Sequence, residues 1–201
     1  MPMGFKIFFK IAEKILLGAN FFLLAVSCLP KGTIISPFAK IIFYNNIEIG
    51  KNCRIPSGCI FRVPKTSRLV IGDNCAFREY TQLMCREKTT TEFGNNCFIG
   101  SFCFISDQIK FGNNVILGPY CSIIAGRHNF KQRDVPINMQ GSSSLPIEIG
   151  SNVWLGAHVI IIGPSKIGSN SIIGAGVIFK GNVPESSLVK SERKNTVSKL
   201  A

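Results

Sequence analysis

The sequence predicts an all-β fold, a parallel β-helix of about six coils that follows an apolar N-terminal helix and is interrupted by one long loop. Two observations predict it: large apolar residues recur every six positions, and many of them are followed by glycine. The chain has 201 residues, of which 46% are hydrophobic and only 17% are charged. That composition provides one sizeable core and excludes wholesale disorder.

The repeat is a hexad with one large residue in each unit. A short strand followed by a bend fits this period, and three such units close a coil whose neighbours pair at about 4.8 Å. Eighteen hexads at three per coil predict about six coils. The positions expected to point inward are all Ile, Leu or Phe: Ile49, Ile55, Phe61, Ile71, Phe77, Leu83, Phe93, Ile99, Ile105, Phe111, Leu117, Ile123, Ile149, Leu155, Ile161, Ile167, Ile173 and Phe179.

The fourth residue after each large one also points inward and must be small. This slot holds six of the eight cysteines, namely Cys53, Cys59, Cys75, Cys97, Cys103 and Cys121. A free cysteine behaves as a small hydrophobe, so we expect reduced core thiols and a reducing compartment. Cys28 and Cys85 lie outside the pattern.

The hexads break most strongly after Ile123. The next repeat begins at Ile149, which leaves about twenty spare residues in a polar, turn-rich excursion over residues 126–146. Long loops on repetitive scaffolds commonly carry function. We therefore expect three parts: an N-terminal helix over 1–30, the β-helix over 31–184 and a basic tail over 185–201.

The N-terminal segment, residues 5–29, is strongly apolar and allows three interpretations. Polar residues recur every seven positions at Lys6, Glu13, Asn20 and Ser27, which favours a helix at a membrane interface or on another protein surface. A helix buried against its own domain and a signal or anchor segment are the alternatives. A spanning helix needs about 20 uncharged residues, which the run does not provide.

The repeat carries a family resemblance. From GNNVILGPYCSIIAGRHNF (112–130) through PIEIGSNVWLGAHVIIIGPSKIGSNSIIGAGVIFKGNVP (146–184), the chain resembles the hexapeptide-repeat acyltransferases, and among them the sugar O-acetyltransferases. The resemblance implies a left-handed coil, a homotrimer, and acetyl-CoA held in the groove between neighbouring β-helices. It implies transfer of an acetyl group to a sugar hydroxyl, with a surface polysaccharide or its precursor as the acceptor.

Such transfer needs a base near neutral pH, and histidine has the appropriate pKa. The chain has two histidines. His128, in AGRHNF, lies where the family carries its general base. His158, in WLGAHVII, is assigned a structural or groove-lining role. Asp107 and Asn129 are candidates for orienting His128 or binding the acceptor.

The cofactor positions also come from the resemblance. Ala157 and Ala175 match small residues whose backbone faces the pantetheine arm of CoA. Phe179 and Lys180 match the end of the GAGxxxxK segment, where a basic residue suits the CoA phosphates. Trp154 is a further candidate for flanking the groove. No metal is expected, because two histidines cannot supply the three that a zinc carbonic anhydrase of this fold requires.

The charge balance bears on partners. A net charge of +12 favours anionic ligands such as phosphates or a membrane surface. No recognition motif indicates a nucleic-acid partner. We expect a cytoplasmic protein, at the inner face of the membrane if residues 5–29 make a peripheral contact there. N-acetylation of an amino sugar and a non-enzymatic scaffold remain the alternative functions.

Overall fold

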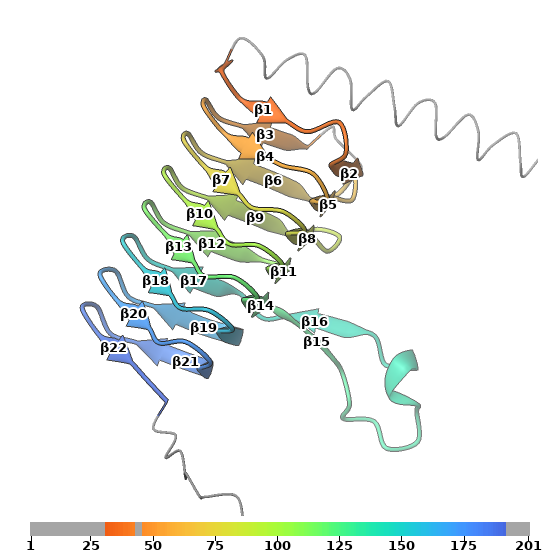
Figure 1. The fold of residues 1–201 in the computed structure, drawn as a ribbon. Coiled ribbons are helices and arrows are strands. Elements are labelled where there is room, and N and C mark those ends of the chain that lie inside the picture. Colours follow the sequence, from red (N-terminus) through yellow and green to blue (C-terminus); the bar gives the residue numbers. More distant parts are fainter. Residues whose placement is uncertain (1–30, 43–45, 192–201) are drawn as a thin grey trace, which may run out of the picture.

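The hexads fold as short strands separated by bends that stack into a parallel β-solenoid of about seven turns (Figure 1). The computed structural model describes residues 31–42 and 46–191. No α-helix occurs within these ranges. The helix expected over 1–30 lies outside them.

The solenoid has three faces, here named A, B and C in chain order. Face A is an eight-stranded parallel sheet. Its strands are β1 (Ile34–Ile35), β4 (Arg54–Ile55), β7 (Ala76–Phe77), β10 (Phe98–Ile99), β13 (Ile116–Leu117), β18 (Trp154–Leu155), β20 (Ile172–Ile173) and β22 (Leu188–Val189).

Faces B and C belong to one twelve-stranded sheet, because its last strands run through the bend between them. Face B contains β2 (Lys40–Ile42), β5 (Ile60–Arg62), β8 (Gln82–Met84), β11 (Phe104–Ser106) and β14 (Ser122–Ile124). Face C contains β3 (Ile47–Ile49), β6 (Arg68–Ile71), β9 (Thr90–Phe93), β12 (Ile109–Phe111) and β17 (Ile147–Ile149). The two strands shared by both faces are β19 (Ile160–Ile167) and β21 (Ile178–Val183).

The predicted number of coils was too small. The strand pairing begins with β1 on β4 and continues to β22 on β20. The predicted series begins only at Ile49, because the step from Ile41 to Ile49 is eight residues instead of six. The first turn has Ile35 and Ile41 at its large positions, paired with Ile55 and Phe61. At the other end, Leu188 and Val189 extend face A beyond Pro184, where we expected the basic tail to begin.

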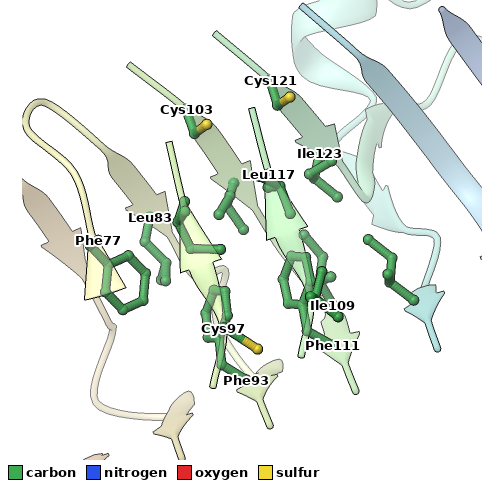
Figure 2. Packing of buried hydrophobic residues seen from close by; sticks show 14 of the residues in the cluster. Phe77, Leu83, Phe93, Cys97, Cys103, Ile109, Phe111, Leu117, Cys121 and Ile123 are labelled. Carbon is green, nitrogen blue, oxygen red and sulfur yellow. The ribbon is translucent and has the colours of Figure 1, made fainter. Parts of the chain in front are cut away.

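The interior follows the predicted inward positions. Seventeen of the eighteen large residues are buried, and Phe179 is partly buried against the core. The rings of Phe61, Phe77, Phe93 and Phe111 form a continuous contact column, ending in a stacked pair 4.5 Å apart between Phe93 and Phe111. Figure 2 shows Phe77, Phe93 and Phe111 packed among the other buried side chains that come from different strands.

The six predicted core cysteines are all buried and unpaired. Several thiols donate to backbone carbonyls of the next turn, as Cys103 does to Gly118 at 3.2 Å and Cys121 to Gly156 at 3.1 Å. Figure 2 places Cys97, Cys103 and Cys121 among the large apolar residues. Cys85, which the hexad did not include, is buried as well and lies 3.5 Å from the hydroxyl of Thr91.

The bend between faces C and A carries a ladder of asparagines. Asn52, Asn74, Asn96, Asn114, Asn152 and Asn170 all have positive φ, a region in which asparagine is enriched. Their side-chain amides bond from turn to turn, at 3.1 Å from Asn96 to Asn114 and at 2.9 Å from Asn152 to Asn170. Hydrogen bonds of this kind fix the turn-to-turn spacing at this edge of the solenoid.

The predicted excursion is an antiparallel hairpin. Its strands are β15 (Gly126–His128) and β16 (Ser142–Ser144), and the short 3₁₀ turn η2 (Ile137–Met139) lies near its tip. Figure 1 shows the hairpin projecting sideways from the stack, at the bend between faces B and C. A helix that is both long and apolar enough to cross a bilayer does not occur in the described part of the chain.

Candidate active site at the hairpin

His128 is the last residue of β15 and is exposed to solvent. It lies directly opposite Ser142 in the antiparallel pair, and Gly126 lies opposite Ser144. The hairpin leaves the solenoid where face B should bend into face C, so its two strands hold the imidazole away from the flat faces. An exposed imidazole on an ordered strand is accessible to a substrate hydroxyl.

Asn129 belongs to the internal framework of the hairpin. Its amide nitrogen donates to the carbonyl of Gln140 at 3.1 Å, and its side-chain oxygen accepts a 2.6 Å hydrogen bond from the hydroxyl of Ser143. Its backbone N–H donates to the carbonyl of Gly141. These bonds close the hairpin next to His128, so the contacts of Asn129 within the chain are structural ones.

Asp107 lies in the turn directly beneath the hairpin. Its side chain is buried, with one carboxylate oxygen lacking a hydrogen-bond partner among the described residues. A Cβ on Gly126 would overlap the other oxygen, so any larger residue there would force the Asp107 side chain to shift. Burial raises the pKa of the Asp107 carboxyl, while the positive charge of Arg86 and the nearby hydroxyl of Ser144 act in the opposite direction.

Lys180 lines an open groove of about 640 Å³ beside the foot of the hairpin. The groove is bounded by Pro146 and Glu148 on one side and by Pro164, Ser165 and Lys166 on the other. Lys166 lies 3.5 Å from Glu148. Lys180 forms no ion pair with a described residue, which leaves its charge available for an anionic ligand.

Ala157 and Ala175 lie at another edge, the bend between faces A and B. They occupy equivalent positions in successive turns, and the N–H of Gly176 donates to the carbonyl of Ala157 at 2.9 Å. Trp154 lies on the outer side of face A, 51% exposed, in a row with Ile116 and Ile172. This edge therefore offers small backbone positions beside exposed apolar side chains.

His158 closes a column of stacked rings at the same edge. The rings of Tyr80, Phe102, Tyr120 and His158 follow one another at 4.9 to 5.1 Å with interplanar angles of 13° or less. All four residues have positive φ, which is strained for bulky side chains. The stacking compensates for that strain, which supports a structural role for His158.

The structure thus separates the candidates into two groups. His128, Asp107, Asn129 and Lys180 lie around the bend between faces B and C. Ala157, Ala175 and Trp154 lie around the bend between faces A and B. The partly buried Phe179 points toward the core from between them. Within one chain, face B separates the two groups.

Two features escaped the sequence analysis. The ring column could have been found, since Tyr80, Phe102, Tyr120 and His158 each directly precede a small inward residue, as the asparagines do in the other bend. The contact of Arg86 with the hairpin, a hydrogen bond to the carbonyl of Ser142, could not have been found from the sequence. Arg86 lies between Leu83 and Phe93, where the step is ten residues instead of six and the hexad therefore gives no register.

Comparison with known proteins supports the repeat and the fold. Residues 146–181 match the family model described as bacterial transferase hexapeptide (six repeats). A comparison with curated protein sequences finds no match.

Among solved structures, the chain is similar to AntD, an N-acyltransferase from Bacillus cereus, in complex with dTDP and 3-hydroxybutyryl-CoA. The identity is 21% and the TM-score 0.52, over 79% of this chain and 74% of that one. A serine-to-cysteine variant of AntD with dTDP-4-amino-4,6-dideoxyglucose and coenzyme A gives 19% identity and a TM-score of 0.51, over 84% and 82% of the chains. The polySia-specific acetyltransferase NeuO has 16% sequence identity and a TM-score of 0.44, over 81% of this chain and 79% of that one. The chain accordingly carries the transferase hexapeptide repeat over residues 146–181 and shares its β-helical fold with AntD.

Proposed function

We propose that this protein is an acyl-CoA-dependent acyltransferase that moves an acetyl group from acetyl-CoA to a sugar hydroxyl. The observation that carries the proposal is the exposed imidazole of His128, held on an ordered hairpin at the single large interruption of the described coil. The hexapeptide match over residues 146–181 and the fold shared with AntD support it.

The chemistry assigned to His128 is general base catalysis. A ring nitrogen takes the proton of the acceptor hydroxyl while that oxygen bonds to the thioester carbonyl carbon. The tetrahedral intermediate then collapses, the carbon–sulfur bond breaks, and the imidazolium returns the proton to the departing CoA sulfur. Backbone N–H groups stabilise the oxyanion.

Two copies of the chain are needed to complete the proposed site. His128 and Lys180 lie at one edge of the solenoid and Ala157 and Ala175 at another, so the two groups meet only if one copy packs its second edge against the hairpin of the next. A cyclic homotrimer satisfies this for every copy at once. In that arrangement the pantetheine arm lies along Ala157 and Ala175, and Trp154 flanks the groove.

Electrostatics agree with a phosphate-bearing cosubstrate. Lys180 forms no ion pair with a described carboxylate, since Glu148 in the same groove pairs with Lys166, and the groove opens beside the hairpin. The acceptor we propose is a surface polysaccharide or its lipid- or nucleotide-linked precursor, modified on the cytoplasmic side of the membrane. Residues 5–29 would supply a peripheral membrane contact.

N-acylation of a nucleotide-linked amino sugar is the second candidate. The similar AntD structures are described as those of an N-acyltransferase, and one contains dTDP-4-amino-4,6-dideoxyglucose. An amine whose conjugate acid has a pKa well below that of an alkylammonium ion is largely neutral near pH 7. It is then already nucleophilic and needs less help from a base than a hydroxyl does. Dependence on His128 therefore distinguishes the two reactions.

The test uses purified full-length protein, acetyl-CoA and detection of the released thiol. Sugars and oligosaccharides that offer only hydroxyls are compared with nucleotide-linked 4-amino sugars. Replacing His128 with alanine should lower the O-acetylation rate about 10²- to 10⁴-fold and leave acetyl-CoA binding nearly unchanged. Transfer to a hydroxyl at the parent rate in this variant would refute the mechanism.

A further inference from the structure

Arg86 ties the hairpin that carries His128 to a lower turn of the solenoid. Its Nη2 donates a hydrogen bond to the backbone carbonyl of Ser142, the residue directly opposite His128. Arg86 lies between β8 and β9, far away in sequence. A guanidinium is planar and presents its donors in a fixed geometry, so this contact restrains the strand that faces the candidate base.

Asp107 fills the space between Arg86 and the hairpin. The bends stack in order along this edge: the N–H of Asp107 donates to Met84 at 3.0 Å, and the N–H of Ala125 donates to Ser106 at 3.2 Å. The Asp107 carboxylate is buried under Gly126, where a Cβ would overlap it. The hairpin therefore rests on a buried acid that feels the charge of Arg86, the same residue that holds Ser142.

The foot of the hairpin has one further backbone tie. The N–H of Leu145 donates to the carbonyl of Ala125, which joins the two ends of the excursion. Beyond it, the residues from Arg127 to Gln140 are exposed or only partly buried. The Arg86 bond is thus the contact by which a lower turn fixes the angle at which β16, and with it β15, leaves the solenoid.

We propose that Arg86 is a positioning residue for acyl transfer, which acts by holding the hairpin so that His128 faces the acceptor. This inference rests on the proposed role of His128. Arg86 does not touch the reacting atoms, so it affects the rate only through the position of the imidazole.

Hydrogen exchange tests the structural half without any assay of activity. In Arg86→Ala, amides of the hairpin, such as those of Asn129 and Leu145, should exchange about tenfold faster, the usual worth of a hydrogen bond from a charged group. Strand amides of the solenoid should keep the parent rate. Arg68→Ala is the matched control, because that arginine is exposed and pairs with Glu48 at 2.8 Å, away from the hairpin. Unchanged exchange in the Arg86→Ala hairpin would overturn the proposal, whatever the activity.

Kinetics test the coupling to His128. Arg86→Ala should lower kcat about tenfold with the KM for acetyl-CoA unchanged, and Arg86→Lys should recover part of the loss. In a His128→Ala background, Arg86→Ala should cost nothing more, because no base remains to be positioned. If the falls in kcat of the two single variants multiply in the double variant, the residues act independently, and the inference is contradicted. If His128→Ala itself retains the parent rate, the proposed function fails, and the exchange experiment still decides whether Arg86 holds the hairpin.

Discussion

The imidazole of His158 stacks on the ring of Tyr120, with 4.9 Å between ring centres and 4° between the planes. The chain has only one other histidine, His128, which is exposed on the hairpin at the opposite edge of face B. The same residue type thus has two different environments. Both histidines are exposed, but the ring of His158 stacks at the end of a column, whereas the ring of His128 stands on the hairpin where the coil is interrupted.

We predict that His158 contributes to stability and not to the chemical step. His158→Ala should lower the free energy of unfolding by about 0.5–1.5 kcal/mol, the typical value of an aromatic pair. His158→Phe retains a ring in the column, so its free energy of unfolding should remain close to that of the parent. Denaturant unfolding measures both, and the acetylation rate of His158→Ala should stay near that of the parent. A rate loss comparable to that of His128→Ala would exchange the roles of the two histidines.

The core was predictable because it is periodic. One large residue in six and one small residue four positions later are sufficient to place Ile99, Leu117 and Cys121 in the interior, where all are at most 1% exposed. The constraint is geometric: each strand has room for one large side chain and each bend for one small one. The ring column and the asparagine ladder follow the same period, since their residues lie one position before the small inward ones.

The remainder of the site is not periodic, and the sequence alone could not place it. The position of His128 came from the family resemblance and from the loop it begins, not from a spacing rule. Arg86 and Asp107 meet the hairpin because the bends of three successive turns stack at one edge. The extra residues between Leu83 and Phe93 interrupt the hexad, so the sequence does not show that these bends align. Ala175 and Lys180 lie five residues apart in the GAGxxxxK segment, yet the structure puts them at different edges.

The buried cysteines should be unreactive in the native protein. Burial raises the pKa of the Cys59 thiol to about 11. For Cys75 the hydrogen bond with Cys53 acts first, lowering the pKa, but a hydrogen bond with Cys97 and burial outweigh it and raise the value to about 11. Hydrogen bonds from neighbouring thiols lower the pKa of Cys97 and Cys121, but both side chains are at most 1% exposed, and access limits their reaction.

Thiol titration at pH 8 measures this prediction, in a Cys28→Ser background so that only the described cysteines are counted. Without denaturant we expect almost no fast reaction, and after unfolding all seven should react. Rapid native labelling of Cys97 or Cys121 would show that the turns open readily. A disulfide between any two of the seven would disprove the inward slot.

Asp107 should make the stability of the protein depend on pH. Its folded-state pKa is raised above the ordinary 3.8, mainly by burial, so the folded state holds the proton more tightly than the unfolded state does. The resulting stability is fully present below the unfolded pKa and is lost as the pH rises through the folded pKa. At neutral pH the ionised carboxylate is therefore a destabilising group.

Asp107→Asn should accordingly have a higher Tm than the parent at pH 7, and the difference should shrink as the pH falls toward about 4. Paired thermal unfolding of the two proteins across this range cancels the titration of other groups. Asn keeps nearly the same volume under Gly126 and removes the titrating group. A difference that stays constant with pH would mean that Asp107 titrates normally.

The separation of the two residue groups predicts complementation between inactive variants. His128→Ala removes the base, and Ala157→Leu places a side chain in the proposed pantetheine path at the other edge. Each variant alone should be inactive. If the site lies between copies of a cyclic trimer, a mixed trimer places the intact His128 of one chain beside the intact Ala157 of its neighbour, and random assembly of equal amounts restores about a quarter of the sites.

The measurement is the acetylation rate of protein co-expressed from both variants, compared with the two pure proteins mixed without exchange of subunits. A site contained within one chain would give no recovery in the co-expressed sample, because every chain would carry one of the two defects, and that result would rule out the intersubunit groove.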